Sequence, residues 1–196
     1  MTPFLLGLTG SIGMGKSTTA GIFEQHGLPV WSADAAVHRL YARGGAAVAP
    51  LGALFPDAVQ DQAISRDVLR QHISRDPTTL ARLENIVHPL VATDRAQFVA
   101  AAQADIVVLD IPLLFENGSQ TQFDATLLVT APAALQRIRV LARPGMTEDH
   151  LQILLSRQMP DAHKRGLATH IVETLDLPST AAYVSALISH IRARHA

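Results

Sequence analysis

Five short apolar runs recur along the chain, at residues 4–9, 30–34, 106–115, 125–130 and 171–173. The third run is nearly continuous in aliphatic residues, as is typical of a central parallel strand that is buried on both faces. Helical patterns lie between these runs. The sequence therefore predicts an α/β fold built on an open parallel sheet of five strands.

Two helices of this pattern have clear ends. A helix beginning at Lys16 is expected to run to His26 and to stop at Gly27, since glycine favours the position after a helix. Near the carboxyl end, residues 181–194 predict an amphipathic helix whose apolar face packs on the sheet. That face comprises Val184, Leu187, Ile188 and Ile191.

The segment from Tyr41 to Gln103 has no comparable strand. Residues 64–74, 78–87 and 89–102 carry apolar side chains at helical spacing, so they predict three helices. We interpret His88, which precedes Pro89, as a turn residue between two of them. A helical insertion between the second and third strands would supply a pocket or lid for a second substrate.

Composition excludes several classes of protein. A chain of 196 residues can bury one core with an inserted subdomain, and its net charge of -1 gives no reason to expect nucleic acid as a partner. The absence of cysteine excludes disulfides and fits a reducing cytoplasm, and no run is long enough to span a membrane. Lys16 and Lys164 are the only lysines.

The segment Gly10–Ser17 matches the phosphate-loop pattern G-x-x-x-x-G-K-[ST] between an apolar run and a helix. Backbone N–H groups and a helix N-terminus bind phosphate, and glycine lets the backbone approach. Lys16 is expected to reach the β- and γ-phosphates, and the Ser17 hydroxyl to ligate Mg²⁺. This prediction, favoured over an ordinary glycine-rich turn, makes the nucleotide-binding residues Gly10, Gly13, Met14, Gly15, Lys16, Ser17 and Thr18.

Two carboxylates follow predicted strands. Asp34 ends the second run and Asp110 stands at the carboxyl end of the third strand, so both are expected at the edge of the sheet where ligands bind. Asp34 is either a group that acts on the substrate or the N-cap of the next helix, and the spacing alone favours neither. Asp110 could hold Mg²⁺ through water, or cap a loop.

Arg139 and Arg143 are four residues apart, so a helix would place both on one face, ahead of a flexible Pro144-Gly145. Such a pair suits a lid that neutralises phosphate charge, although most faces of this kind are merely solvated. With only two lysines, the chain lacks the Asn-Lys-x-Asp of a GTPase, and it is short for a coupling ATPase. A small-molecule kinase fits best.

From end to end, the chain resembles the dephospho-coenzyme A kinase family. The similar segments are Leu8–Thr18, Ser32–Asp34, Leu83-Glu84 with His88-Pro89, Ile111–Glu116, Gln136 with Arg139 and Arg143, and Gln158-Met159 with Lys164. Two positions depart from the family pattern. Ser32 replaces the first residue of Asp-Ala-Asp, and Thr174 stands where the family has an asparagine that helps to hold adenine.

The resemblance implies transfer of the γ-phosphoryl group of ATP, with Mg²⁺, to the 3′-hydroxyl of the ribose of dephospho-CoA, the last step of coenzyme A synthesis. Asp34 would accept the hydroxyl proton, while Lys16, Arg139 and Arg143 would neutralise charge. The implied fold is a three-layer α/β/α P-loop core similar to nucleoside monophosphate kinases, at 1–34, 104–135 and 165–196. A helical substrate domain at 35–103 and a lid at 136–164 would complete it. We expect a cytoplasmic enzyme, with a monomer favoured, that binds ATP and dephospho-CoA but neither nucleic acid nor membrane.

Overall fold

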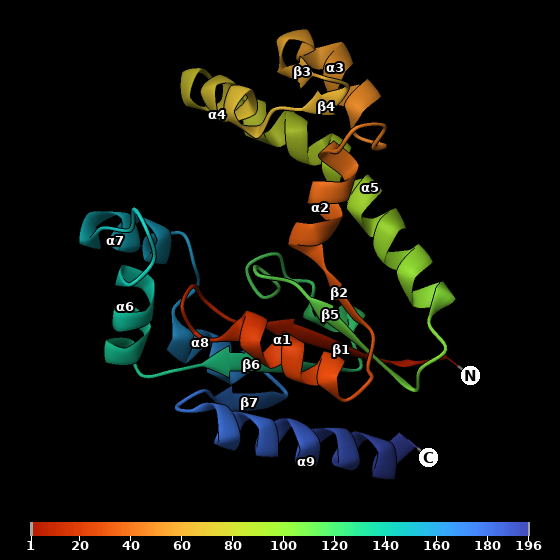
Figure 1. The fold of residues 1–196 in the computed structure, drawn as a ribbon, viewed down its shortest axis with the longest axis vertical. Helices are drawn as coiled ribbons and strands as arrows, with labels where there is room; N and C mark the ends of the chain where they lie inside the picture. The colour runs from red at the N-terminus through yellow and green to blue at the C-terminus, as the bar shows by residue number, and fades with distance from the viewer. Residues whose placement is uncertain (1, 196) are drawn as a thin grey trace. The chain divides into compact units, whose positions relative to one another are not determined.

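The computed structural model describes residues 2–195 and contains the predicted sheet of five strands (Figure 1). The strands are β1 (Phe4–Thr9), β2 (Val30–Ser32), β5 (Ile106–Asp110), β6 (Ala125–Thr130) and β7 (His170–Glu173), in the spatial order β2-β5-β1-β6-β7. β1 pairs in parallel with both β5 and β6, and β6 with β7. The prediction of a five-stranded parallel sheet is confirmed.

The chain divides into two compact units. The first comprises the residues up to Val30 together with those from Ala102 onward, and the second comprises Trp31–Ala101. The finer division into a core, a substrate domain and a lid stays a prediction.

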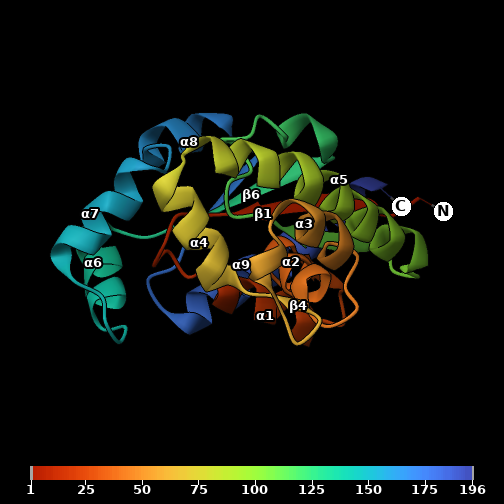
Figure 2. The ribbon, with the colours of Figure 1, turned by 90° about the horizontal axis from the view of Figure 1, so that it is seen from above.

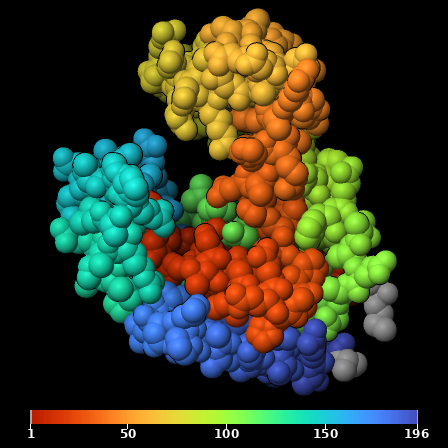
Figure 3. Space-filling model, viewed as in Figure 1, coloured from red at the N-terminus to blue at the C-terminus, as the bar shows by residue number. Residues whose placement is uncertain are grey.

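In the first unit, helices cover one face of the sheet, because alternate residues of each strand present their apolar side chains to that face. α1 (Lys16–Gln25) and α9 (Leu177–His195) lie side by side, as Figures 1 and 3 both show, and they pack against this face. Their buried side chains join those of the strands in one apolar core. α1 ends as predicted before Gly27, whose φ of 75° is the left-handed conformation that glycine tolerates.

The other face carries a second, smaller apolar cluster. Leu127 belongs to the first core and its neighbour Leu128 to the second, so the two clusters lie on opposite sides of the sheet. Leu114 and Phe115, from the segment after β5, cover Leu128. The remaining elements of this unit are η2 (Gln120–Gln122), α6 (Ala133–Leu141), α7 (Glu148–Ser156) and α8 (Asp161–Leu167).

The second unit is mainly helical. Its elements are α2 (Ala33–Tyr41), α3 (Val48–Leu54), η1 (Pro56–Ala58), the hairpin strands β3 (Val59–Gln60) and β4 (Ala63–Ile64), α4 (Arg66–Arg75) and α5 (Thr78–Ala101). Figure 2 shows α2, α3 and α4 gathered along α5, and all four helices contribute to one apolar core.

The expectation of two helices separated by a turn at His88 is wrong. α5 is continuous through Pro89, so His88 is an exposed helix residue rather than a turn. Proline removes one helix hydrogen bond, but apolar residues on both sides of Pro89 pack into the same core, and this packing keeps the helix intact. The hairpin β3-β4 and helix α3 had no predicted counterpart.

Within residues 2–195, no helix is both long and apolar enough to cross a membrane.

Candidate active site

The loop between β1 and α1 has the geometry that a phosphate loop requires. Gly13 and Gly15 adopt φ values of 76° and 94°, which side-chain-bearing residues rarely reach, and Gly15 caps α1. The first turn of α1 therefore begins directly at Lys16, with its N–H groups at the end of the loop. The strand, loop and helix arrangement predicted from the sequence is confirmed. A helix start of this kind attracts anions.

The structure adds a second reason for glycine in this loop. A Cβ at Gly13 would clash with Val140 of α6, and a Cβ at Gly15 would lie 2.8 Å from the hydroxyl oxygen of Thr174, just after β7. Distances below 3.0 Å force a neighbour to move. The glycines thus allow two other elements of the first unit to touch the back of the loop.

Lys16 forms an ion pair with Asp110 at the carboxyl end of β5. Their side chains are only 14% and 10% exposed. β5 lies beside β1, with Asp110 opposite Leu8, so the carboxylate stands next to the start of the loop. Asp110 therefore has an electrostatic partner at the phosphate loop.

The first half of the loop is held by residues of α8 and of the segment that leads into it. Nζ of Lys164, which is fully buried, donates to Oγ of Ser11 over 3.1 Å and pairs with Oε1 of Glu116 at 2.8 Å. Gln158 accepts a hydrogen bond from the N–H of Ile12. Burial of Glu116 by itself favours the neutral acid, but hydrogen bonds from Lys164 and from the Met159 N–H outweigh it and lower the pKa of Glu116.

The second half of the loop is held by Thr174. Its hydroxyl donates to the carbonyl oxygen of Met14 over 2.7 Å and accepts from Nη1 of Arg139 over 2.8 Å. Arg139 also donates through Nη2 to the Thr174 carbonyl over 2.7 Å. The threonine that replaces the expected asparagine therefore joins α6, the end of β7 and the phosphate loop.

The expected shared helix face of Arg139 and Arg143 is wrong. α6 ends at Leu141, and the N–H of Arg143 bonds to the carbonyl of Val140 in the following turn, where Gly145 has a φ of 73°. Arg139 is half-buried against Thr174, whereas Arg143 is exposed. The helix ends two residues before Arg143, because the residue that precedes a proline disfavours the helical conformation.

Asp34 belongs to the second unit and is exposed in the first turn of α2. The N-cap of that helix is Ser32, whose hydroxyl accepts a hydrogen bond from the N–H of Ala35 over 3.4 Å. The alternative interpretation of Asp34 as the cap is therefore wrong. Its role as a proton acceptor stays a prediction.

The residues present suit Mg²⁺. The hydroxyl of Ser17, exposed in the first turn of α1, and the carboxylate of Asp110 are oxygen donors in the same unit. Among residues 2–195 no three acidic, histidine or cysteine side chains gather as a metal cluster. Mg²⁺ does not need such a cluster, because it keeps several waters and binds substrate phosphates with one or two protein groups.

The sequence analysis linked Lys164, Glu116, Gln136 and Thr174 to function only through the family resemblance, and it assigned none of them a contact at the phosphate loop. The signal for Lys164 was its isolation, as one of two lysines in the chain. Gln136 is buried, and its amide donates to the carbonyl of Ile12 over 2.8 Å. Gln136, Lys164 and Thr174 lie 124 to 160 positions along the chain from the loop residues that they contact, and Glu116 lies about 100 positions from the loop. No local sequence pattern connects residues so far apart.

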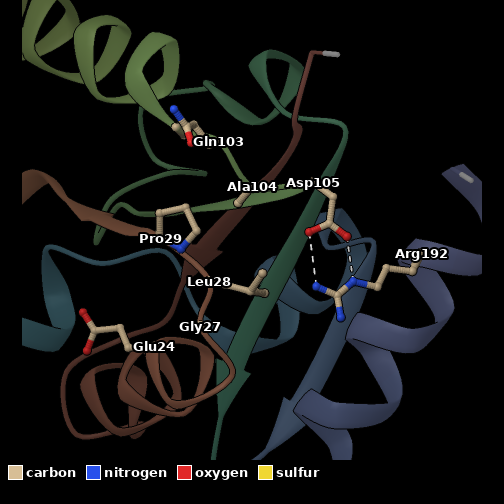
Figure 4. A pocket seen from close by; sticks show the side chains of 9 residues that line it. Glu24, Gly27, Leu28, Pro29, Gln103, Ala104, Asp105 and Arg192 are labelled. Carbon is tan, nitrogen blue, oxygen red and sulfur yellow. Dashed lines mark hydrogen bonds and ion pairs between the residues drawn. The ribbon is translucent and has the colours of Figure 1, made fainter.

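A separate hollow of about 880 Å³ opens at the amino ends of the strands. It is lined by Glu24, Gly27, Leu28, Pro29, Ala102, Gln103, Ala104, Asp105 and Arg192. Figure 4 shows Arg192 of α9 reaching Asp105 through two hydrogen bonds, of 2.6 and 3.2 Å. Ligands of open parallel sheets bind at the carboxyl ends of the strands, so this hollow is not the candidate active site.

Comparison with known proteins agrees with this geometry. The family model of dephospho-CoA kinase matches residues 4–176. A curated dephospho-CoA kinase of Cereibacter sphaeroides is 62% identical over 192 residues, covering 98% of each chain.

Two solved structures share the fold. A crystal structure from Thermus thermophilus has a TM-score of 0.86 at 34% identity, covering 97% of this chain and 98% of the other. A dephospho-CoA kinase from Campylobacter jejuni has a TM-score of 0.68 at 20% identity, with the same coverage.

Proposed function

The chain belongs to the dephospho-CoA kinase family, and we propose that its phosphate loop and surrounding residues transfer the γ-phosphoryl group of ATP to the 3′-hydroxyl of dephospho-CoA. The chain is an ATP-dependent kinase. One observation carries the assignment of the site: the loop with two left-handed glycines places Lys16 at a helix start and beside a carboxylate.

Phosphoryl transfer depends on alignment and on neutralising charge. The loop N–H groups bind the phosphate chain of ATP. The ammonium group of Lys16 binds the β- and γ-phosphates. Ser17, and Asp110 through water, would hold Mg²⁺, which would offset negative charge on the phosphate oxygens.

The acceptor hydroxyl forms a new bond to the γ-phosphorus while the bond from that phosphorus to the bridging oxygen of ADP breaks. Asp34 takes the proton that the hydroxyl loses, so ADP leaves with the electron pair and coenzyme A carries the phosphate. Arg143, exposed beyond α6, supplies positive charge to the transferring group. The second unit binds the rest of dephospho-CoA.

One coupled assay tests this proposal. The purified protein is given ATP and Mg²⁺ with dephospho-CoA, with nucleoside monophosphates, or with no acceptor, and ADP release is followed. Fast turnover with dephospho-CoA, and with no other acceptor, supports the proposal. ADP release without an acceptor should be weak because closure of the predicted lid excludes water. Preferential use of nucleoside monophosphates, or fast hydrolysis without an acceptor, would contradict it.

A further inference from the structure

The buried ion pair of Lys164 and Glu116 touches the phosphate loop through Ser11. Lys164 has no exposed side-chain surface, and Glu116 is 15% exposed. Burying an ammonium group without a partner is costly, so the carboxylate neutralises it. Oε1 of Glu116 is fixed in turn by the N–H of Met159 at 2.9 Å. The position of the lysine Nζ is therefore set by the segment after β5 and by the segment that precedes α8.

From this position Nζ of Lys164 donates to Oγ of Ser11, itself only 7% exposed. An ammonium group can donate three hydrogen bonds, and here it uses one on its counter-ion and one on the loop. The hydrogen bond to Ser11 is charge-assisted and buried, which makes it stronger than an ordinary surface hydrogen bond.

The next residue of the loop is fixed by two glutamines. Gln158 accepts from the N–H of Ile12 over 3.2 Å, and Gln136 donates to the carbonyl of Ile12 over 2.8 Å. Ser11 and Ile12 are thus held by side chains from three places in the first unit. Lys164 is the charged member of this set.

We propose that Lys164 is a positioning residue for ATP, which acts through Ser11 to hold the first half of the phosphate loop in its anion-binding conformation. The inference rests on the proposed function, because it requires the loop to bind the phosphates of ATP. Lys164 is neutralised by Glu116, so it acts by placing the loop. Its loss therefore weakens nucleotide binding and leaves the binding of dephospho-CoA unchanged.

The decisive variant is Ser11→Ala, which removes the acceptor and keeps the ion pair of Lys164 and Glu116. Isothermal titration with the non-hydrolysable β,γ-imido analogue of ATP should show binding weakened about tenfold, the equivalent of one charge-assisted hydrogen bond. The KM for ATP should rise by the same factor, while the KM for dephospho-CoA stays at the wild-type value. A merely structural role would not separate the two KM values.

Lys164→Met removes the charge and keeps a side chain of similar length. If it folds, it should weaken binding of the analogue at least as much as Ser11→Ala, and the double variant should bind no more weakly than Lys164→Met alone. The matched control is Arg165→Met, which alters the adjacent position of α8, where the guanidinium pairs with Asp161 and is 40% exposed. Binding of the analogue should be unchanged in this control.

Wild-type affinity for the analogue in Ser11→Ala would overturn the inference, whether or not Lys164→Met folds. Additive losses in the double variant would also overturn it, since Lys164 would then act by a route other than Ser11. Wild-type protein that failed to bind the analogue would contradict the phosphate-loop assignment, and the positioning role with it.

Discussion

The ion pairs at the phosphate loop of the first unit are more deeply buried than the ion pairs of the second unit. In the first unit, the ion pairs at the phosphate loop are largely buried: Lys16 with Asp110 and Lys164 with Glu116. In the second unit, Arg39 pairs with Asp94 and Arg70 with Asp67, and both arginines are more than half exposed. Buried pairs are costly to break, whereas exposed pairs contribute little. The difference fits the rigid anion site that we propose for the first unit.

The second unit is stabilised mainly by its apolar core, to which all four of its helices contribute. One of its polar contacts is partly buried: the indole N–H of Trp31 donates to Asp94 over 2.7 Å, and Arg39 adds further bonds to the same carboxylate.

The largest expected effect is that of Lys16→Met. The variant removes the loop cation, and kcat should fall about a thousandfold, the upper range for losing one charge-stabilising group. Steady-state kinetics with dephospho-CoA measures this, with circular dichroism to verify the fold. A kcat within tenfold of wild type would place charge neutralisation on another residue.

Glu116→Gln should destabilise the protein by about 3 kcal/mol near neutral pH, because Lys164 remains buried without its counter-ion. The folded-state pKa of Glu116 is lowered from 4.5, so its stabilising contribution is present above that pH and is lost as the pH falls through the folded-state pKa. Urea unfolding at several pH values should show the variant and wild type converging below about pH 4.5. A constant difference across that range would mean that the carboxylate is not ionised in the folded state.

Asp34→Asn should lower kcat about a hundredfold, with little change in either KM, because the amide keeps the shape of the side chain but cannot accept a proton. This is the exception within the second unit, since an exposed residue there is expected to have a large effect. Kinetics over a range of pH provides the measurement. Near-normal turnover would remove Asp34 from the mechanism.

Gly15→Ala and Gly44→Ala compare the units at matched backbone angles, with φ of 94° and 74°. A Cβ at Gly15 meets Thr174, whereas no described atom lies within 4 Å of a Cβ at Gly44. Gly44→Ala should cost about 1 kcal/mol for the left-handed backbone alone, and Gly15→Ala about 2 kcal/mol more from the clash. Thermal unfolding of both variants tests this, and equal losses would count against a tightly supported loop.

Arg70→Ala should have the smallest effect. Its pair with Asp67 on α4 is 72% and 79% exposed, so the free energy of unfolding should change by less than about 0.5 kcal/mol. A loss larger than 1 kcal/mol in urea unfolding would show that exposed ion pairs contribute substantially to the stability of the second unit.

Local patterns in the sequence predicted the features that depend on neighbouring residues. The strand, loop and helix around Lys16 were predicted because glycine, lysine and the apolar run before them act within about fifteen positions. The position of Asp110 followed from the apolar strand that it ends. The buried face of α9 followed from helical spacing alone.

The features that the sequence did not predict depend on residues far apart in the chain. The hydrogen bond between Thr174 and Met14 spans 160 positions, and that between Lys164 and Ser11 spans 153. Neither has a periodic signal. Local rules also failed where packing outweighed them, as at Pro89, and where a helix ended early, as before Pro144.

Hydrogen exchange tests most directly the claim that the first unit holds the nucleotide. We predict that the β,γ-imido analogue of ATP, added with Mg²⁺ and without dephospho-CoA, slows amide exchange in residues 10–19 and leaves residues 48–101 unchanged. Protection confined to the second unit, with exchange in the loop unaltered, would contradict the account.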